Sequence, residues 1–141
     1  MGRPFVWSIG ADIVDIQRFR RIDYKSHKEF YERLFTAREI EYCLSFKNSA
    51  EHFAATFAGK EAVYKALSNH ININLRDIEI IRKNGVPQVN LTVKEWNRQK
   101  EERPKVNVKV SLSHSSSHAI AFAVATFQSS MTHESPFPGE E

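Results

Sequence analysis

Three charged residues interrupt an apolar stretch in the middle of the chain. Residues 53–67 read F-A-A-T-F-A-G-K-E-A-V-Y-K-A-L, and the charges are Lys60, Glu61 and Lys65. A helix here would carry aromatic side chains on one face and alanines on the other, so it is predicted to pack on both faces. One interpretation is an ordinary i,i+4 ion pair between Glu61 and Lys65, with Lys60 extended toward solvent. The other is a cleft where these charges bind a phosphate through a metal ion.

A metal site of this kind needs oxygen ligands from more than one element. Mg²⁺ usually takes only one or two protein carboxylates and completes its coordination with water and substrate phosphate. Glu61 is one candidate ligand, and Asp12 is the candidate for the second. Asp12 ends a predicted strand that otherwise needs apolar residues, two positions after Gly10, where a ligand or backbone can approach closely. A polar strand end or a helix cap is the competing interpretation of Asp12.

A serine-rich segment begins at His114 and ends at His118, between two predicted strands. A hydrophilic hairpin loop is the simplest interpretation, and the functional one is that His114 donates to a phosphate. The hydrolase motif G-x-S-x-G is absent, and no third zinc ligand has suitable local spacing. Neither a Walker A loop nor G-x-G-x-x-G occurs, which argues against nucleotide binding by those routes.

A basic segment follows the first predicted strand and contains Arg18, Arg20 and Arg21. Such a cluster is either a solvated helix face or a docking patch for an acidic protein, where charge mainly raises the association rate.

The bulk composition is typical of one globular domain. The chain has 141 residues, 41% of them hydrophobic, and a formal net charge of +3. No apolar window is long enough to suggest a membrane span, so no membrane association is expected. The single cysteine, Cys43, cannot form an internal disulfide, and a cytoplasmic location is expected. The charges are dispersed, which counts against the rival hypothesis of a small nucleic-acid-binding domain.

The hydrophobic patterning predicts an α+β domain over residues 1–127, followed by a flexible tail at 128–141. The spacing of Thr36 and Glu39 is that of a capping box, and Asn84 followed by Gly85 is a strong hairpin signal. The expected strands are 5–13, 77–81, 86–93, 106–112 and 119–127. Helices are expected at 37–46, 51–68 and 94–102. Residues 17–21 are expected to begin a further helix, and residues 30–35 are expected to be helical or irregular.

Four segments together resemble one family. Residues 9–16, I-G-A-D-I-V-D-I, resemble its opening G-x-D-(I/L)-V-x-(I/V), and residues 35–39 resemble its F-T-x-x-E. Residues 57–66, F-A-G-K-E-A-V-Y-K-A, resemble its F-A-x-K-E-A-x-x-K-A, and residues 110–114 its V-S-(I/L)-(S/T)-H. On these motifs, which occur in the family's order, the chain is similar to the holo-acyl-carrier-protein synthases, the short 4′-phosphopantetheinyl transferases.

The resemblance implies a fold, an activity and an assembly. The fold would be a single α+β domain with an antiparallel sheet packed against a long central helix. The activity would be Mg²⁺-dependent transfer of 4′-phosphopantetheine from coenzyme A to a serine of apo acyl carrier protein, releasing adenosine 3′,5′-bisphosphate. The assembly would be a homotrimer with active sites at subunit interfaces.

The resemblance also implies roles for individual residues. Asp12 and Glu61 match the Mg²⁺-binding carboxylates, and both are expected, with Lys65, to act in catalysis. Lys60, Lys65 and His114 fall where the family binds the phosphates of coenzyme A. The segment that meets the acidic carrier contains Arg18, here followed by Arg20 and Arg21.

Two positions depart from the family pattern. Thr56 stands where many members carry arginine, and Gly59 replaces the usual alanine at a local helix cost of about 1 kcal/mol. Two alternatives share the predicted fold: the same chemistry on a peptidyl or polyketide carrier domain, and a catalytically inactive carrier-binding domain.

Overall fold

The computed structural model describes residues 5–92 and 105–128, and the helix predicted at 94–102 lies outside them. The predicted tail also lies outside, apart from Gln128, which ends the last strand. The α+β class is confirmed. The elements are, in chain order, β1 (Phe5–Asp15), α1 (Gln17–Arg21), α2 (Lys28–Leu34), α3 (Ala37–Leu44), α4 (Ser49–Leu67), a 3₁₀ turn (Leu75–Asp77), β2 (Ile78–Lys83), β3 (Val86–Leu91), β4 (Lys105–His114) and β5 (His118–Gln128).

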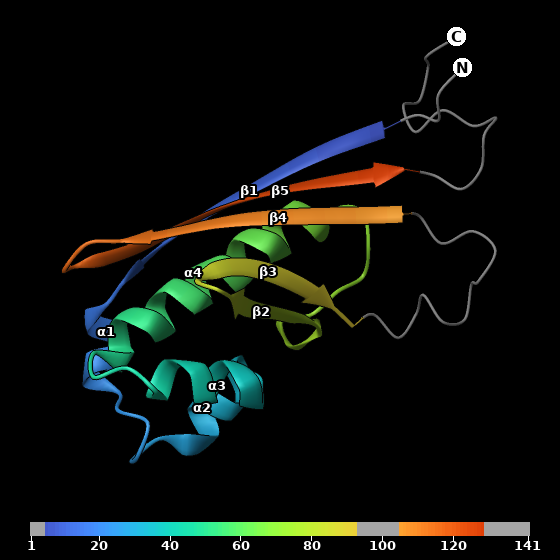
Figure 1. Cartoon of the computed structure of the whole chain (residues 1–141). Helices are drawn as coiled ribbons and strands as arrows, with labels where there is room; N and C mark the ends of the chain where they lie inside the picture. Colours follow the sequence, from blue (N-terminus) through green and yellow to red (C-terminus); the bar gives the residue numbers. More distant parts are fainter. Residues whose placement is uncertain (1–4, 93–104, 129–141) are drawn as a thin grey trace, which may run out of the picture.

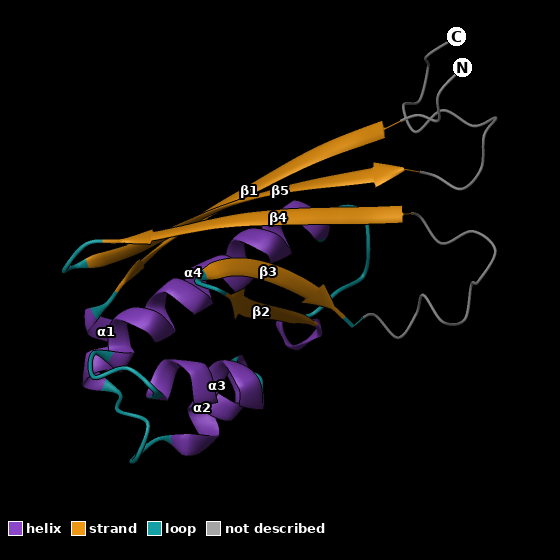
Figure 2. Ribbon diagram, viewed as in Figure 1, coloured by secondary structure: helices purple, strands orange, loops and turns teal. Residues whose placement is uncertain are grey.

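The three longest strands form one antiparallel sheet in the order β1-β5-β4, and α4 lies across one face of it (Figures 1 and 2). Asp12 pairs with Ala121, and Leu112 of β4 pairs with the same residue from the other side. Successive side chains of a strand alternate between the faces. Asp12 therefore shares the helix-covered face with the buried Gly10 and Val14.

The small residues of α4 explain how closely it lies on the sheet. Ala54, Ala58, Ala62 and Ala66 are completely buried. An added Cβ on Gly10 would overlap the carbonyl oxygen of Ala62, so the helix backbone approaches β1 at this glycine.

The opposite side of α4 faces the short N-terminal helices (Figure 1). It packs there against a group of aromatic rings. Phe53 contacts Tyr31, with ring centroids 4.6 Å apart, and Phe35, with centroids 5.1 Å apart. Phe19 of α1 joins the same group through Phe57, at 5.8 Å. The predicted packing of α4 on both faces is confirmed.

Two local predictions are also confirmed. Thr36 and Glu39 form a capping box at the start of α3, which ends at Leu44 rather than at residue 46. Asn84 and Gly85 have φ values of 51° and 79°, as a two-residue type I′ hairpin turn requires, and they join β2 to β3. No helix among the described residues is long and apolar enough to cross a membrane.

Candidate active site at the edge of β1

Asp12 and Lys65 meet at the free edge of β1. The ammonium of Lys65 lies 3.1 Å from Oδ1 of Asp12 and donates to the carbonyl oxygen of Ala11 at 3.0 Å. Asp12 lies inside β1, which is two residues longer than the predicted strand, rather than at a strand end. Within the part of the chain that the structure describes, Lys65 makes no ion pair with Glu61. The simple i,i+4 interpretation of the sequence is therefore wrong.

Glu61 lies one helical turn before Lys65 and is electrostatically coupled to Asp12. Burial raises the pKa of the Glu61 carboxyl, and the negative charge of Asp12 raises it further. The positive charges of Lys65 and Arg18 act in the opposite direction. Two carboxylates close enough to repel each other form a site that a divalent cation would stabilise.

The donor set at this edge suits Mg²⁺ better than a metal that needs several protein ligands. No group of three or more His, Cys, Asp or Glu side chains that could hold a metal occurs in residues 5–92 and 105–128. Two carboxylates with room for water and phosphate oxygens are the set that Mg²⁺ usually takes. Asp12 and Glu61 fit that requirement.

The edge opens onto a hollow on the outer face of the sheet. The hollow has a volume of about 480 Å³, and Asp12 and Lys65 form part of its wall. The outer face around it is unusually apolar: Trp7 is 70% exposed and Ile13 66%. Ile9, Ile120 and Phe122 are further large apolar side chains exposed on these strands.

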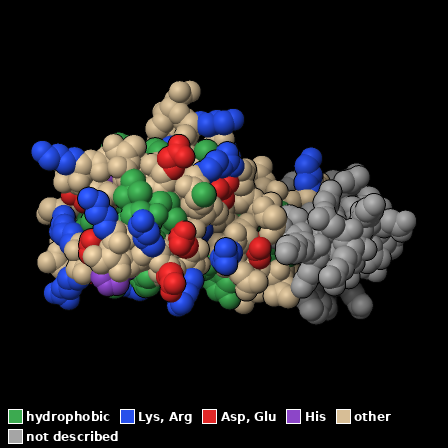
Figure 3. All heavy atoms as spheres, turned by 90° about the horizontal axis from the view of Figure 1, so that it is seen from below, with side chains coloured by type: hydrophobic (Ala, Val, Ile, Leu, Met, Phe, Trp, Pro, Cys, Tyr) green, Lys and Arg blue, Asp and Glu red, His purple; other side chains and the backbone are tan. Residues whose placement is uncertain are grey.

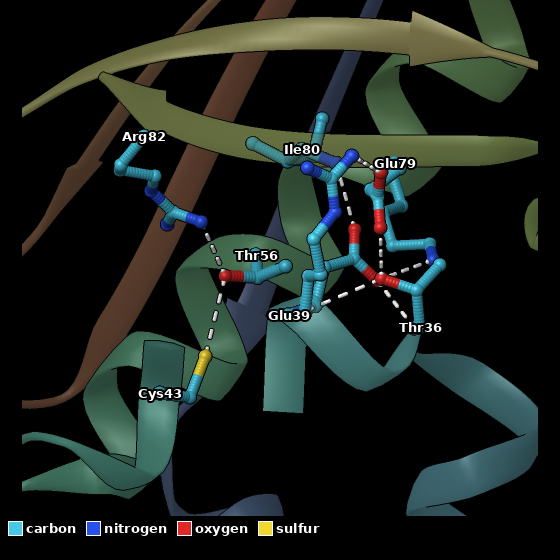
Figure 4. A network of polar contacts seen from close by, with 9 residues as sticks. Thr36, Glu39, Cys43, Thr56, Glu79, Ile80 and Arg82 are labelled. Atoms are coloured by element: carbon cyan, nitrogen blue, oxygen red, sulfur yellow. Dashed lines mark hydrogen bonds and ion pairs between the residues drawn. The ribbon is translucent and has the colours of Figure 1, made fainter. Parts of the chain in front are cut away.

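Lys60 lies elsewhere. It is completely buried, and its ammonium donates to Oε1 of Glu39 at 2.7 Å. Oε2 of Glu39 accepts a hydrogen bond from the backbone N–H of Ile80, also at 2.7 Å, in the network of Figure 4. Burial lowers the pKa of Lys60, and the charge of Glu39 opposes that shift. The interpretation in which Lys60 extends into solvent is therefore wrong, and the structure does not bring Lys60 to the edge of β1.

His114 also lies away from Asp12. Its Nδ1 is 3.6 Å from Oε2 of Glu51, near the start of α4. Ten residues separate Glu51 from Glu61, or about 15 Å along a helix axis. Among the described residues of one chain, His114 therefore belongs to a separate part of the surface.

The arginines after β1 point to different partners. The guanidinium of Arg18 lies 5.3 Å from the centre of the Phe57 ring, close enough to Glu61 to influence its pKa. Arg20 donates to the carbonyl oxygen of Ser116 at 3.2 Å and lies 3.6 Å from a Glu51 oxygen. Arg18, Arg20 and Arg21 are all exposed.

Positive and negative side chains are mixed on the lower face of the molecule as Figure 1 is oriented, which is the face that Figure 3 shows. Figure 3 shows lysine and arginine side chains interspersed with acidic ones there, around a group of apolar side chains. The described residues form no continuous basic stripe on this face of the kind that nucleic-acid binding requires.

Sequence reasoning missed a second group of polar residues, on the α3 side of α4. The guanidinium of Arg82 donates to Oγ1 of Thr56 at 2.8 Å, and the Thr56 hydroxyl lies 3.6 Å from Sγ of Cys43 (Figure 4). Burial raises the pKa of Cys43 to about 12. No motif marks Arg82, because only the folded hairpin brings β2 against Thr56.

The comparisons with known sequences agree on one family. The family model of the 4′-phosphopantetheinyl transferase superfamily matches residues 8–123. A holo-acyl-carrier-protein synthase of Caldicellulosiruptor saccharolyticus is 43% identical over 124 residues, which cover 85% of this chain and 96% of that protein. The holo-acyl-carrier-protein synthase of Chlamydia felis is 40% identical over 119 residues, covering 83% and 94%.

Solved structures give the same result. The Helicobacter pylori holo-acyl-carrier-protein synthase in complex with coenzyme A is 30% identical and superposes with a TM-score of 0.65, over 82% of this chain and 96% of that one. The Bacillus anthracis holo-acyl-carrier-protein synthase in complex with coenzyme A (3′,5′-ADP) is 29% identical, with a TM-score of 0.65 over 90% and 100%.

Proposed function

The chain belongs to the 4′-phosphopantetheinyl transferase superfamily, and we propose from this that it transfers 4′-phosphopantetheine from coenzyme A to a serine of apo acyl carrier protein. The observation that carries the proposal is the meeting of Asp12 and Lys65 at the edge of β1, with Glu61 one turn away. These are the charged positions of the two most specific family motifs. Relatives named holo-acyl-carrier-protein synthase match this chain over 96% and 94% of their own length.

We propose that Asp12 and Glu61 hold Mg²⁺ together with the pyrophosphate of coenzyme A. A bound divalent cation would offset phosphate charge as it moves during transfer. In the protein without a metal, burial raises the pKa of Glu61 and the charge of Asp12 adds to that effect.

The transfer forms a bond between the serine Oγ and the β-phosphorus of coenzyme A. It breaks the bond from that phosphorus to the bridging oxygen, which leaves on adenosine 3′,5′-bisphosphate. The serine proton would go to the Glu61 carboxylate or to a water held by the metal ion. Lys65 offsets the charge on the departing bisphosphate, since phosphoryl transfer depends chiefly on positioning and charge stabilisation.

Lys60 and His114 take different parts in this proposal. His114 remains a candidate phosphate donor because its side chain is partly exposed. Lys60 is buried and its ammonium donates to Glu39. We therefore propose that Lys60 positions α4, and with it Glu61, and does not contact a phosphate.

We propose that the acidic carrier docks on the exposed arginines at the start of the helical segment. Arg18 is the central residue because it lies beside Glu61, where the carrier serine must arrive. Arg20 and Arg21 extend the same basic surface.

We further propose a homotrimer in which copies of the chain cover one another's outer sheet face. A sheet face with Trp7, Ile9 and Ile13 each more than 60% exposed is costly in water. Because the hollow beside Asp12 opens on that face, a neighbouring copy would close the active site. A cytoplasmic location, expected from the single cysteine, also stays a prediction.

The test is mass spectrometry of apo carrier proteins incubated with this enzyme and coenzyme A, with Mg²⁺ or with EDTA. Acyl, peptidyl and polyketide carriers should be compared. A gain of one phosphopantetheine that requires the metal supports the proposal. No gain on any carrier, with the enzyme folded, would instead indicate an inactive carrier-binding domain.

A further inference from the structure

The Lys65 ammonium lies where a cation bound to Asp12 is expected. It is 3.1 Å from Oδ1 of Asp12 and donates to the carbonyl oxygen of Ala11 at 3.0 Å. A carboxylate and a backbone carbonyl are oxygen ligands of the kind that Mg²⁺ and Ca²⁺ bind. In the free protein, therefore, a side-chain ammonium occupies the position where these oxygen atoms of β1 would accept a metal ion.

Asp12 needs a positive partner even when no metal ion is bound. Its side chain is only 17% exposed, so the carboxylate has lost much of its contact with water. A partly buried carboxylate is costly unless a positive charge pairs with it. Lys65 supplies that charge, because the guanidinium of Arg18 lies elsewhere, over the ring of Phe57.

The side chain of Lys65 is free to move. It is 52% exposed and lies in the last turn of α4, where it forms part of the wall of the hollow beside Asp12. A lysine carries its charge as a compact ammonium on a flexible stem of four carbons. The ammonium can therefore leave Asp12 without any rearrangement of helix or strand.

The ammonium and a divalent cation would interfere with each other at Asp12. Mg²⁺ binds carboxylate oxygens at about 2.1 Å, so a metal ion on the same oxygen would lie within about 5 Å of the ammonium. The second oxygen of Asp12 is bound to the same carbon and offers little more separation. Because like charges repel each other strongly in a partly desolvated site, the ammonium lowers the affinity of the free protein for a metal ion.

A phosphate group in the hollow would reverse this effect. It would offer the Lys65 ammonium a new anionic partner, and a metal ion could then replace the ammonium on Asp12. A ligand shifts such an equilibrium only when it binds the two states with different affinity. Coenzyme A meets this condition, because its pyrophosphate binds more strongly to an ammonium that no carboxylate neutralises.

We propose that Lys65 takes the place of the metal ion on Asp12 in the free protein and moves to a phosphate of coenzyme A when both ligands bind. This inference rests on the proposed function for the identity of the ligands. Mg²⁺ and coenzyme A then bind cooperatively, and by linkage each raises the affinity for the other by the same factor. Direct contact between metal and phosphate would also couple the two ligands, but the metal affinity of the free protein would then not depend on Lys65.

The experiment measures the affinity of the protein for Mn²⁺ without coenzyme A, by electron paramagnetic resonance of the free ion. Mn²⁺ prefers the same oxygen ligands as Mg²⁺. Lys65→Met should bind Mn²⁺ about tenfold more tightly than the wild type, because the change removes a like charge from the site. Lys65→Arg keeps the charge and should bind Mn²⁺ as the wild type does. Lys83→Met removes an exposed lysine from β2 and is the matched control, with no expected change.

A double variant, Lys65→Met with Asp12→Asn, shows where the ion binds and should lose the tighter binding. Equal or weaker Mn²⁺ binding by Lys65→Met, with a native circular dichroism spectrum, would overturn the inference. Tight binding retained in the double variant would also overturn it.

The proposed function can fail separately. Tighter Mn²⁺ binding by Lys65→Met, with no transfer to any carrier by the wild type, would support the role of Lys65 and reject the transferase. Transfer by the wild type, with unchanged Mn²⁺ affinity in Lys65→Met, would do the reverse.

Discussion

The ammonium of Lys60 lies 2.7 Å from Oε1 of Glu39, and both side chains are almost completely buried. The same carboxylate also accepts from the backbone of Thr36 and of Ile80. One buried ion pair thus ties α3, α4 and β2 together. The lysine of the K-E-A motif is therefore placed to support the fold, while the adjacent Glu61 reaches the candidate site.

We predict that Lys60→Met destabilises the protein by about 3–5 kcal/mol, because it leaves the Glu39 charge buried without its partner. Urea denaturation followed by circular dichroism measures this, with Lys83→Met as the control. A double variant, Lys60→Met with Glu39→Gln, should recover part of the loss. If Lys60→Met unfolded at the wild-type urea concentration, the pair would have no structural importance.

The substitutions Gly10→Ala and Gly59→Ala should change the stability of the protein differently, in the sign or in the size of the effect. A Cβ on Gly10 would overlap backbone of α4, at Ala62, and lie 2.9 Å from the amide nitrogen of Ala66. Neither strand nor helix can yield cheaply there, so a loss of several kcal/mol is expected. A Cβ on Gly59 would lie 2.8 Å from the end of the Leu112 side chain and in ordinary contact with Ile80, at 3.6 Å. The change would gain about 1 kcal/mol of helix propensity.

Thermal denaturation of the two variants measures the difference. Gly59→Ala should melt close to the wild type, and Gly10→Ala far below it or not fold at all. Equal melting temperatures would contradict the close approach of α4 to β1.

Arg18→Glu should raise the KM for the carrier protein on the order of tenfold and change the KM for coenzyme A little, because charge reversal repels an acidic partner. Steady-state kinetics with each substrate varied in turn measure the two constants. Lys25→Glu makes the same charge change at an exposed site after α1 and is the control. A rise confined to coenzyme A would place Arg18 with the cofactor instead.

The stability of the protein should fall as the pH drops below 6.5, in part because of His52. Burial lowers the pKa of His52 in the folded protein, and the charges of His114 and Arg82 lower it further, whereas Glu51 acts in the opposite direction. The unfolded chain therefore binds this proton more readily than the folded one. The stability that His52 contributes is present above pH 6.5 and is lost as the pH falls through its lowered pKa.

Urea denaturation at about pH 7.5 and at about pH 5 measures this loss. Other groups also titrate in this range, so the informative quantity is the difference between the wild type and His52→Gln. An equal loss of stability in the two proteins would exclude His52 as a cause.

Features set by local sequence were predictable. The capping box at Thr36 and the turn at Asn84 depend on neighbouring residues, and both form as predicted. The two-faced packing of α4 followed from its aromatic and alanine arcs. The short 3₁₀ turn at Leu75–Asp77 was missed, since its asparagine-rich surroundings resemble a linker.

Pairings between distant segments were not predictable. The sequence spacing predicted Glu61 as the partner of Lys65, but the Lys65 ammonium lies 3.1 Å from Oδ1 of Asp12 at the strand edge. The sequence suggested that Lys60 extends into solvent, but in the folded chain its ammonium binds the carboxylate of Glu39, 21 positions away. Arg82 carried no signal at all, because its surroundings come from two helices that meet only in the folded chain.

The most direct test of the central claim is the rate at which Glu61→Gln loads apo acyl carrier protein, followed by mass spectrometry with Mg²⁺ and coenzyme A at saturation. The variant should keep the wild-type circular dichroism spectrum and lose on the order of a hundredfold in rate or more, because it removes the carboxylate charge beside Asp12 and a candidate proton acceptor. Glu29→Gln, an exposed change on α2, should load carrier at the wild-type rate. A Glu61→Gln enzyme that loads carrier as fast as the wild type would contradict the assignment of the active site to this edge.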